Sequence, residues 1–265
     1  MSMPIRLPET AARFTRAPQN RSLERGVEIL RAFRPGNDLL GNGELAERTG
    51  LSLATVSRLT QTLVTTGLLE HDRQARAYRL APPVLSLAHA MRGASPLLSC
   101  AAPLMRAASE KLHLNVGLAA PDRDEMVYLE SFRYNRRPSL RTVVAGQRVP
   151  MELTSLGRAY LATCDAAERD RHFAAFKAHR RRGWVALSRA INQSIADVRA
   201  RDYCSVSWQP QVTAMSTPLI APGYAPCVLN MSATGEDRAP RFDTAVAEAL
   251  MALKARILEA LARLR

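Results

Sequence analysis

The chain contains few cysteines and no long apolar segment. Its four cysteines, Cys100, Cys164, Cys204 and Cys227, lie far apart among 265 residues and form no CxxC pair. This spacing excludes zinc fingers and a dense disulfide framework, and it favours reduced thiols. No apolar run approaches the length of a transmembrane helix, and the N-terminus lacks the apolar core of a signal peptide. We therefore expect a cytoplasmic protein without a membrane partner.

The sequence also lacks the common catalytic motifs. It contains no GxSxG, no HExxH, no P-loop and no GxGxxG after a predicted strand. His172 and His179 lie seven residues apart on one predicted helix, which is more typical of a solvated face than of a metal site. We therefore predict that the protein is not an enzyme and that it uses no metal and no cofactor.

Acidic residues are scarce relative to basic ones. The chain carries 37 Lys and Arg against 24 Asp and Glu, a formal net charge of +13, and most of the basic residues are arginine. Such an excess suits a polyanionic partner. The excess is +5 over residues 1–92 and +8 over the remainder, so charge alone locates no binding region.

A helix-turn-helix pattern occupies residues 42–63. Asn42 is the expected N-cap of the first helix, and Gly50 ends that helix in a left-handed conformation. Ser52 then caps the second helix. The pattern predicts two short helices joined by a tight turn.

The second helix of this pair has one apolar face and one polar face. Val56, Leu59 and Leu63 form the apolar stripe. The opposite surface, here called the reading face, carries Ala54, Thr55, Ser57, Arg58 and Gln61. Small residues with hydroxyl, guanidinium and amide groups can read base edges in a DNA major groove. The alternative is an ordinary pair of packed helices with a polar outer surface.

A β-hairpin wing is predicted after the helices. A first helix at 22–33 precedes the helix-turn-helix, and two extended runs follow it, at Leu68–His71 and Ala77–Leu80. Basic residues in such a hairpin meet DNA phosphates. Outside the reading face, the expected DNA contacts are Arg21, Ser52, Arg73, Arg76 and Arg79.

A linking helix is predicted at 84–92. Its apolar face carries Val84, Leu87, Ala88 and Met91. One winged domain buries too little surface to select a genomic site, so we expect two copies held together. The apolar face suits pairing across a two-fold axis, and it equally suits packing against the chain's own C-terminal half.

Extended runs and helices alternate through the C-terminal half. Extended runs are predicted at Leu114–Ala119, Met126–Phe132, Leu140–Val144, Tyr203–Trp208, Ala214–Ile220 and Cys227–Ser232, and helices at 96–112, 155–163, 166–178, 188–201 and from about 243. Gly146–Pro150 is expected to be a turn at the sheet edge. The pattern predicts an antiparallel sheet with flanking helices, and so an α+β fold class.

Several of these stretches resemble the IclR-type bacterial transcription regulators. Arg21–Gly26 resembles that family's opening signature, Glu44–Ser52 and Thr55–Leu59 its helix-turn-helix, and Ala77–Leu80 the end of its wing. Further matches are Val127–Glu130, Gly146 with Pro150, Thr154–Ala159 and Val212–Leu219. The resemblance covers roughly residues 21–265 and implies a winged helix-turn-helix, a linker helix and a GAF-like effector domain.

The resemblance also implies a small-molecule effector, often an organic or aromatic acid, and homodimers that frequently pair again into dimers of dimers on palindromic operators. The implied effector-binding residues are Thr154, Ser155, Leu156, Ser207, Ala214, Asn230 and Ser232. The chain departs from the family pattern near Trp208, where an acidic run is missing, and at Gln211, where a glycine is usual. Trp208 offers a flat apolar face to an aromatic ligand, so we include it in the site; alternatively, it fills the pocket.

We therefore predict a one-component regulator that binds double-stranded operator DNA. The expected divisions are a DNA-binding domain at 20–81, a linker helix at 82–93 and an effector domain at 94–265. Two other functions remain open. One is a ligand-independent regulator with a degenerate sensor domain, and the other is an enzyme fused to a DNA-binding domain.

Overall fold

The computed structural model describes residues 20–36, 38–134, 144–209, 212–234 and 244–264. Contacts divide the chain between Ala88 and His89 into two compact units. Each unit has a hydrophobic core of its own. Within the described ranges, no helix combines the length and the apolar character needed to cross a membrane.

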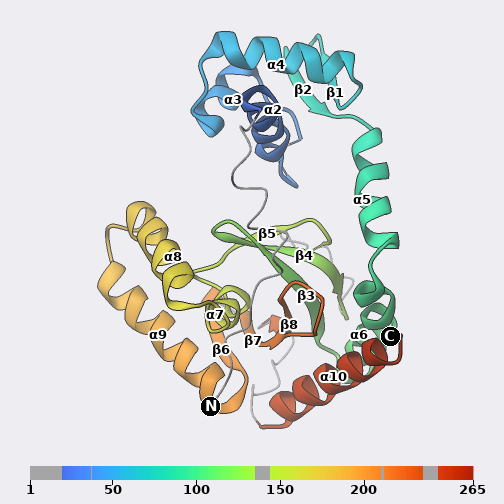
Figure 1. Cartoon of the computed structure of the whole chain (residues 1–265), viewed down its shortest axis with the longest axis vertical. Helices are drawn as coiled ribbons and strands as arrows, with labels where there is room; N and C mark the ends of the chain where they lie inside the picture. Colours follow the sequence, from blue (N-terminus) through green and yellow to red (C-terminus); the bar gives the residue numbers. More distant parts are fainter. Residues whose placement is uncertain (1–19, 37, 135–143, 210–211, 235–243, 265) are drawn as a thin grey trace. The chain divides into compact units, whose positions relative to one another are not determined.

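The first unit is a winged helix-turn-helix (Figure 1). Its elements are α2 (Arg21–Ala32), α3 (Asn42–Thr49), α4 (Leu53–Thr65), β1 (Leu69–Asp72) and β2 (Ala77–Leu80). Ile29 of α2, Leu45 of α3 and Val56 of α4 are completely buried and pack in one core. The apolar stripe predicted for the second helix is thus the side of α4 that faces the other helices.

Local capping explains where these helices begin and end. Gly50 has φ +67° and closes α3 with a hydrogen bond from its amide to the Ala46 carbonyl (2.9 Å). Ser52 caps α4 as predicted, because its Oγ accepts from the Thr55 amide (3.4 Å). The prediction of Asn42 as N-cap is wrong by one residue. Gly41 takes that position because the Glu44 carboxylate accepts from its amide (2.9 Å).

The predicted wing is an antiparallel hairpin with one additional pairing. β1 and β2 pair from Leu69 opposite Leu80 to Asp72 opposite Ala77. Leu40, just before α3, forms a bridge with Tyr78 through two backbone hydrogen bonds (2.9 and 3.0 Å). This bridge fixes the wing to the segment that leads into the helix-turn-helix.

Helix α5 (Pro83–Gly93) covers the stretch predicted as a linking helix, and the division between the two units falls within it. None of its residues is buried. Leu87 and Met91, one turn apart on the predicted apolar face, are 63 and 52% exposed, and Leu85, on the other side of the helix, is 74% exposed.

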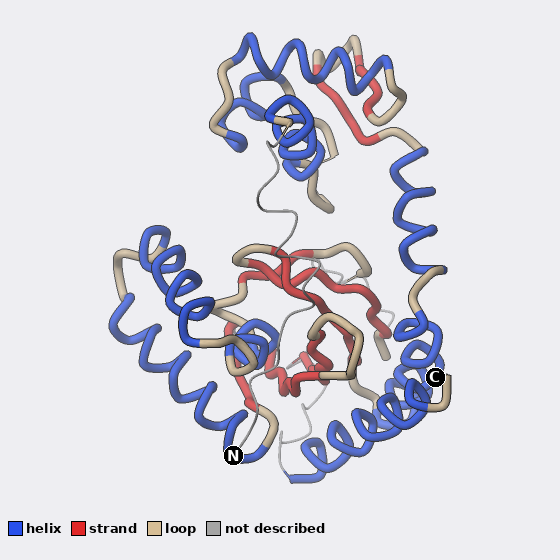
Figure 2. Tube along the Cα trace, in the orientation of Figure 1, coloured by secondary structure: helices blue, strands red, loops and turns tan. Residues whose placement is uncertain are grey.

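The second unit is an antiparallel sheet with helices on both faces (Figure 2). The strands follow the order β5-β4-β3-β8-β7-β6, and every pairing is antiparallel. They are β3 (Asn115–Asp122), β4 (Glu125–Phe132), β5 (Arg148–Pro150), β6 (Cys204–Gln209), β7 (Val212–Leu219) and β8 (Cys227–Thr234). The first long strand, β3, therefore lies beside the last strand, β8.

The helices of this unit form two groups, one on each face of the sheet (Figure 1). They are α6 (Pro96–Leu112), α7 (Ser155–Leu161), α8 (Ala166–His179), α9 (Trp184–Arg201) and α10 (Thr244–Ala262). α6 and α10 share a core with one face, where Leu118, Leu229 and Met231 are buried. α7, α8 and α9 share a second core with the other face.

Two predictions for this half need correction. Arg148–Pro150 is a short edge strand rather than a turn, because it pairs with β4, Val149 opposite Met126. α9 begins at Trp184, four residues before the predicted start. Of the run predicted at 140–144, residues 140–143 lie outside the described residues.

Candidate DNA-binding surface and effector pocket

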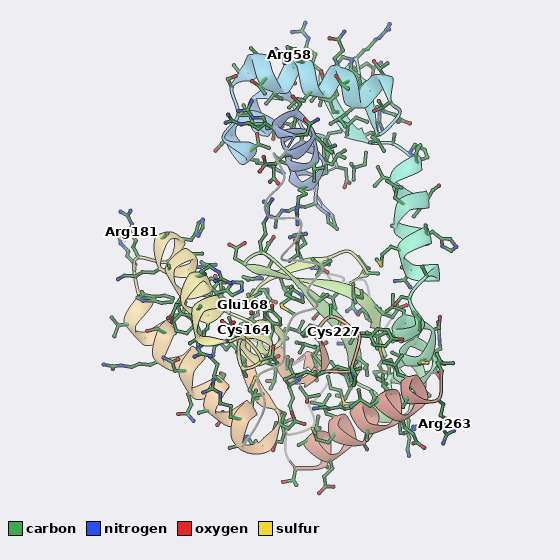
Figure 3. The ribbon with its side chains drawn as sticks, in the orientation of Figure 1. Arg58, Cys164, Glu168, Arg181, Cys227 and Arg263 are labelled. Atoms are coloured by element: carbon green, nitrogen blue, oxygen red, sulfur yellow. The ribbon has the colours of Figure 1, made fainter. Side chains whose placement is uncertain are left out.

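The reading face of α4 is turned away from the core of the first unit. Ala54, Ser57, Arg58 and Gln61 are exposed, and Thr55 is half-buried. The Thr55 hydroxyl lies 3.0 Å from the Ser52 hydroxyl, which is also exposed. Figure 3 shows Arg58 on the outer side of α4. The structure thus places the five residues of the reading face, together with the Ser52 cap, on one outward-facing side of α4.

The arginines of the wing differ in their surroundings. Asp72 organises the hairpin turn, since its carboxylate accepts from the amides of Gln74 (3.0 Å) and Ala75 (2.9 Å). The same carboxylate pairs with Arg79 (2.8 Å). The pKa of Asp72 is lowered, chiefly by the hydrogen bond from the Ala75 amide. The Arg79 charge and the Gln74 amide lower it further. Arg79 also lies 3.7 Å from a Glu70 oxygen, so two carboxylates already offset its charge.

Arg73 and Arg76 are exposed at the tip of the hairpin. Arg76 has φ +49°, a left-handed conformation that is uncommon for residues other than glycine. Arg21, the remaining predicted contact, is exposed in the first turn of α2 directly after the Asn20 cap. The wing tip therefore presents Arg73 and Arg76 to solvent, and the hairpin base holds Arg79.

In the second unit, most of the predicted effector residues gather at the face of the sheet that α7 covers. Ser216, on β7, stands opposite Asn230 on β8, which in turn stands opposite Gly117 on β3. The Ser216 hydroxyl donates to the Ser155 hydroxyl of α7 (2.7 Å). Ser155, Ser216 and Asn230 are 1, 0 and 3% exposed. Neutral polar groups are thus concentrated inside the domain.

The Asn230 side chain lacks one hydrogen bond. Its Oδ1 is buried and has no partner among the described residues. The Tyr128 phenol is buried near this side chain; burial raises its pKa, and the Asn230 side chain offsets part of that rise. A buried polar atom without a partner costs about 1–3 kcal/mol. Here it marks a point where a ligand donor would be stabilised. We define Tyr128, Ser155, Ser216 and Asn230 as the effector cluster.

Glycine is required beside this cluster. A Cβ on Gly117 would lie 2.5 Å from both the Asn230 Oδ1 and the Tyr128 ring, and a Cβ on Gly157 would lie 2.1 Å from the Met151 carbonyl oxygen. The second position lets α7 approach the chain before it. Thr154 caps α7, accepting from the Gly157 amide (3.3 Å) and donating to the Pro150 carbonyl (2.9 Å).

Arg158, next to Gly157, ties α7 to α9. Its guanidinium donates to the Glu152 carbonyl (3.0 Å) and to the Ser194 hydroxyl on α9 (3.3 Å). Burial lowers its pKa. The Thr154–Ala159 motif therefore consists of a cap, a close-packing glycine and an arginine anchor, and these together hold Ser155 against the sheet.

Comparison with known proteins assigns the chain to a family. Residues 22–73 match the model of the IclR helix-turn-helix domain, and residues 89–209 match the model of the bacterial transcriptional regulator IclR C-terminal domain. The HTH-type transcriptional regulator TsaQ1/TsaQ2 of Comamonas testosteroni is 33% identical over 220 residues, which cover 74% of this chain and 78% of the relative. The chain belongs to the IclR family.

Solved structures of the IclR family share this fold. An IclR family regulator from Brucella abortus matches with a TM-score of 0.82 and 30% identity, covering 92% of this chain and 95% of that one. An IclR homologue from Microbacterium hydrocarbonoxydans, solved with 4-hydroxybenzoate, matches in fold with a TM-score of 0.70 and 20% identity, covering 91% and 99%. Like its relatives, the chain is a DNA-binding transcription regulator with an α+β fold.

Not every residue predicted from the IclR resemblance joins the effector cluster. Ser207 is exposed and lies 2.9 Å from the hydroxyl of Thr213. Thr213 pairs with Ala233, whose side chain packs in the α6–α10 core, so Ser207 lies on the opposite face of the sheet. Trp208 is half-buried beside an irregularity in the β6–β7 register.

The remaining predicted residues lie on the α7 side of the sheet. Ala214 is buried and stands opposite the half-buried Ser232, one step along the face from Ser216 and Asn230. Thr154 and Leu156 are buried on either side of Ser155. Sequence reasoning missed Tyr128 and Ser216. Ser216 could have been predicted from the sequence, because it follows Ala214 by two residues on one strand and so lies on the same face of the sheet.

Proposed function

We propose that this IclR-family regulator reads its operator with the reading face of α4 in the major groove. Arg58 is the residue with the longest reach on that face, and its fork of donors suits a guanine edge. Ser57, Gln61 and Thr55 complete the base contacts, and Ala54 allows close approach. The observation that carries this proposal is that these residues, exposed except for the half-buried Thr55, lie on one side of a helix whose other side is buried.

The phosphate contacts follow from the exposure of the wing. Arg73 and Arg76 are placed at the hairpin tip, and Arg21 and Ser52 each lie at the start of a helix. Arg79 contributes less, because Asp72 and Glu70 already pair with it. The functional divisions that we propose are 20–81 for DNA binding, 82–93 for the link and 94–265 for sensing, in the cytoplasm, where bacterial DNA is found.

Selection from a random duplex library with the full-length protein tests operator binding. The expected product is an enriched palindromic sequence, because two winged domains read two half-sites. Binding that stays equal across sequences and depends only on salt would contradict the proposal, since phosphate contacts alone carry no sequence information.

The sensor site, we propose, takes a small aromatic acid that also carries a hydroxyl group. The carboxylate would accept from the Ser155 and Ser216 hydroxyls, and the ligand hydroxyl would donate to the Asn230 Oδ1. Two observations support this chemistry. The buried Asn230 Oδ1 has no hydrogen-bond partner among the described residues, and the homologue from Microbacterium hydrocarbonoxydans was solved with 4-hydroxybenzoate. Trp208 would supply an aromatic wall.

Calorimetric titration with 4-hydroxybenzoate and with benzoate tests this ligand class. The hydroxylated acid should bind more tightly to the wild type, and the difference should vanish in Asn230→Leu. Ser207→Ala is the matched control, because Ser207 lies on the other face of the sheet. Equal affinities for the two acids would contradict the assigned role of Asn230.

A ligand-independent regulator is the second candidate, and the packing of the cluster favours it. Ser155 and Ser216 already satisfy one another, and both are inaccessible to solvent. A ligand must therefore replace their hydrogen bond. A carboxylate library that changes neither thermal stability nor operator affinity would support this second function.

The regulator, we propose further, acts as a homodimer that pairs into a dimer of dimers. The exposed apolar residues Leu87 and Met91, one turn apart on α5, support pairing through that helix. Leu87→Asp should lower the mass measured by light scattering and weaken operator binding at the same time. A wild type that stays monomeric on DNA at micromolar concentration would contradict it.

A further inference from the structure

Three residues with metal-binding side chains meet at the junction of α7 and α8, apart from the effector cluster. Cys164 lies between the two helices, directly before the Asp165 cap of α8, and Glu168 and His172 follow at intervals of four residues. The interval between Glu168 and His172 places both side chains on one face of α8, and Cys164 lies just before that helix. Figure 3 shows Cys164 and Glu168 close together at this junction.

The geometry of the three donors is close to that of a coordination site. The Cys164 Sγ, a Glu168 carboxylate oxygen and a His172 ring nitrogen all lie within 4.8 Å of one another. Bonds of about 2.0–2.3 Å to a tetrahedral metal ion would separate such donors by about 3.3–3.8 Å. Side-chain rotations that bring the donors together by about one ångström would therefore complete the site.

The neighbouring side chains already orient these donors. The Tyr160 hydroxyl donates to Glu168 Oε1 (2.9 Å), which leaves Oε2 for a metal ion. Arg169 donates to the Cys164 carbonyl (3.2 Å) and so fixes the backbone at the thiol. The His172 ring stacks on Phe176 at 5.8 Å between centroids. Such outer contacts are a regular feature of metal sites, because they hold ligands in position.

The cluster has access to solvent. Glu168, His172 and Tyr160 line a surface hollow of ≈ 570 Å³, and Asp124 and Arg171 line it as well. A metal ion can therefore enter from this side, and a water molecule can occupy its fourth position. Cys164, by contrast, is buried, which protects the metal–sulfur bond.

We propose that Cys164, Glu168 and His172 bind one divalent transition-metal ion of the zinc type, with water as the fourth ligand. A thiolate, an imidazole and a carboxylate form the mixed set that Zn²⁺ accepts, whereas Ca²⁺ and Mg²⁺ prefer oxygen ligands alone. On binding, the Cys164 thiol releases its proton to solvent and forms the metal–sulfur bond. The ion would join the end of α7 to α8.

Titration of the reduced, metal-free, full-length protein with Co²⁺ tests the site. A four-coordinate cobalt ion with one thiolate gives visible bands and a sulfur-to-metal charge-transfer band in the near ultraviolet. The expected result is saturation at one equivalent, with both signals displaced by one equivalent of Zn²⁺. Mg²⁺ should displace neither signal.

Variants distinguish this site from binding elsewhere on the chain. Cys164→Ser should abolish the charge-transfer band, and His172→Gln should abolish saturable binding. Tyr160→Phe should weaken binding by about 10-fold to 100-fold, because Glu168 loses its orienting donor. Cys100→Ser and His179→Gln are the matched controls, and both should bind as the wild type does.

Circular dichroism confirms that each variant is folded before it is titrated, and any unfolded variant is replaced by Glu168→Gln. A charge-transfer band that persists in folded Cys164→Ser would overturn the proposal. So would a wild-type titration that shows no saturation at one equivalent. Neither outcome depends on operator binding, so the test is independent of the proposed regulatory function.

Discussion

The two units of this regulator place their polar groups in opposite settings. On the winged helix-turn-helix, the polar groups of the reading face are exposed on one helix, and they are consecutive or nearly consecutive in sequence. In the sensor unit, the polar groups of the effector cluster are buried, and they come from α7, β4, β7 and β8. The first site therefore depends on local helix geometry, and the second depends on how distant strands pair.

This difference means that substitutions should act differently in the two units. A change on the reading face should remove one of the proposed DNA contacts and leave the fold intact, because most of these side chains are exposed. A change near the effector cluster alters packing first and ligand binding second. The predictions that follow range from the largest expected effect to the smallest.

Gly157→Ala should have the largest effect, and it should be confined to the sensor unit. The added Cβ would meet the Met151 backbone at 2.1 Å, and backbone cannot move aside as a side chain can. Overpacking of this kind should lower the free energy of unfolding by about 3 kcal/mol. Calorimetry should show a lower Tm for one transition only. Gly43→Ala is the control, since a Cβ there meets nothing within 4 Å. A Tm equal to that of the wild type would refute the close packing of α7.

Ser216→Ala should have a moderate effect on stability and a clear effect on ligand binding. It removes the hydrogen bond to Ser155, which is worth about 0.5–1.5 kcal/mol. Chemical denaturation monitored by circular dichroism would measure this loss. Affinity for 4-hydroxybenzoate should fall in the same variant, whereas Ser207→Ala should change neither quantity. If Ser216→Ala binds the acid as tightly as the wild type does, Ser216 does not contact the ligand.

Arg79→Ala should have the smallest effect of the three. The arginine lies in an exposed ion pair with Asp72, and such pairs contribute about 0–1 kcal/mol. Its loss should change operator affinity less than the loss of Arg73 at the wing tip. Fluorescence anisotropy at several salt concentrations compares the two variants. A larger loss for Arg79→Ala would show that DNA displaces the Asp72 pair.

Sequence reasoning predicted the local features and missed those that depend on distant parts of the chain. The roles of Gly50 and Ser52 and the apolar stripe of α4 follow from helix geometry alone. The sequence was therefore sufficient to predict which residues form the reading face. The Leu40–Tyr78 bridge was not, since a single pairing leaves no periodic signal. The edge strand β5 was missed because three residues are too short for an alternating pattern.

The sensor site shows the same limit. Tyr128 and Asn230 meet because β4 and β8 both flank β3, and no motif in the sequence carries that strand order. The family resemblance supplied Asn230 and Ser155 but also Ser207, which lies on the other face. The prediction that the chain has no metal site considered His172 and His179 alone; the site that we propose adds Cys164, which precedes the helix, and titration decides between the two.

The measurement that tests the central assignment most directly is operator discrimination by Arg58→Ala. Competition anisotropy with the selected operator and with single-base variants of one half-site gives the ratio of specific to non-specific affinity. Arg58→Ala should lose about 1–3 kcal/mol on the operator and become tolerant at one base position. Arg73→Ala should weaken all sequences alike and reduce the salt slope by about one unit. If Arg58→Ala retains the full discrimination of the wild type, the outer face of α4 does not read the operator.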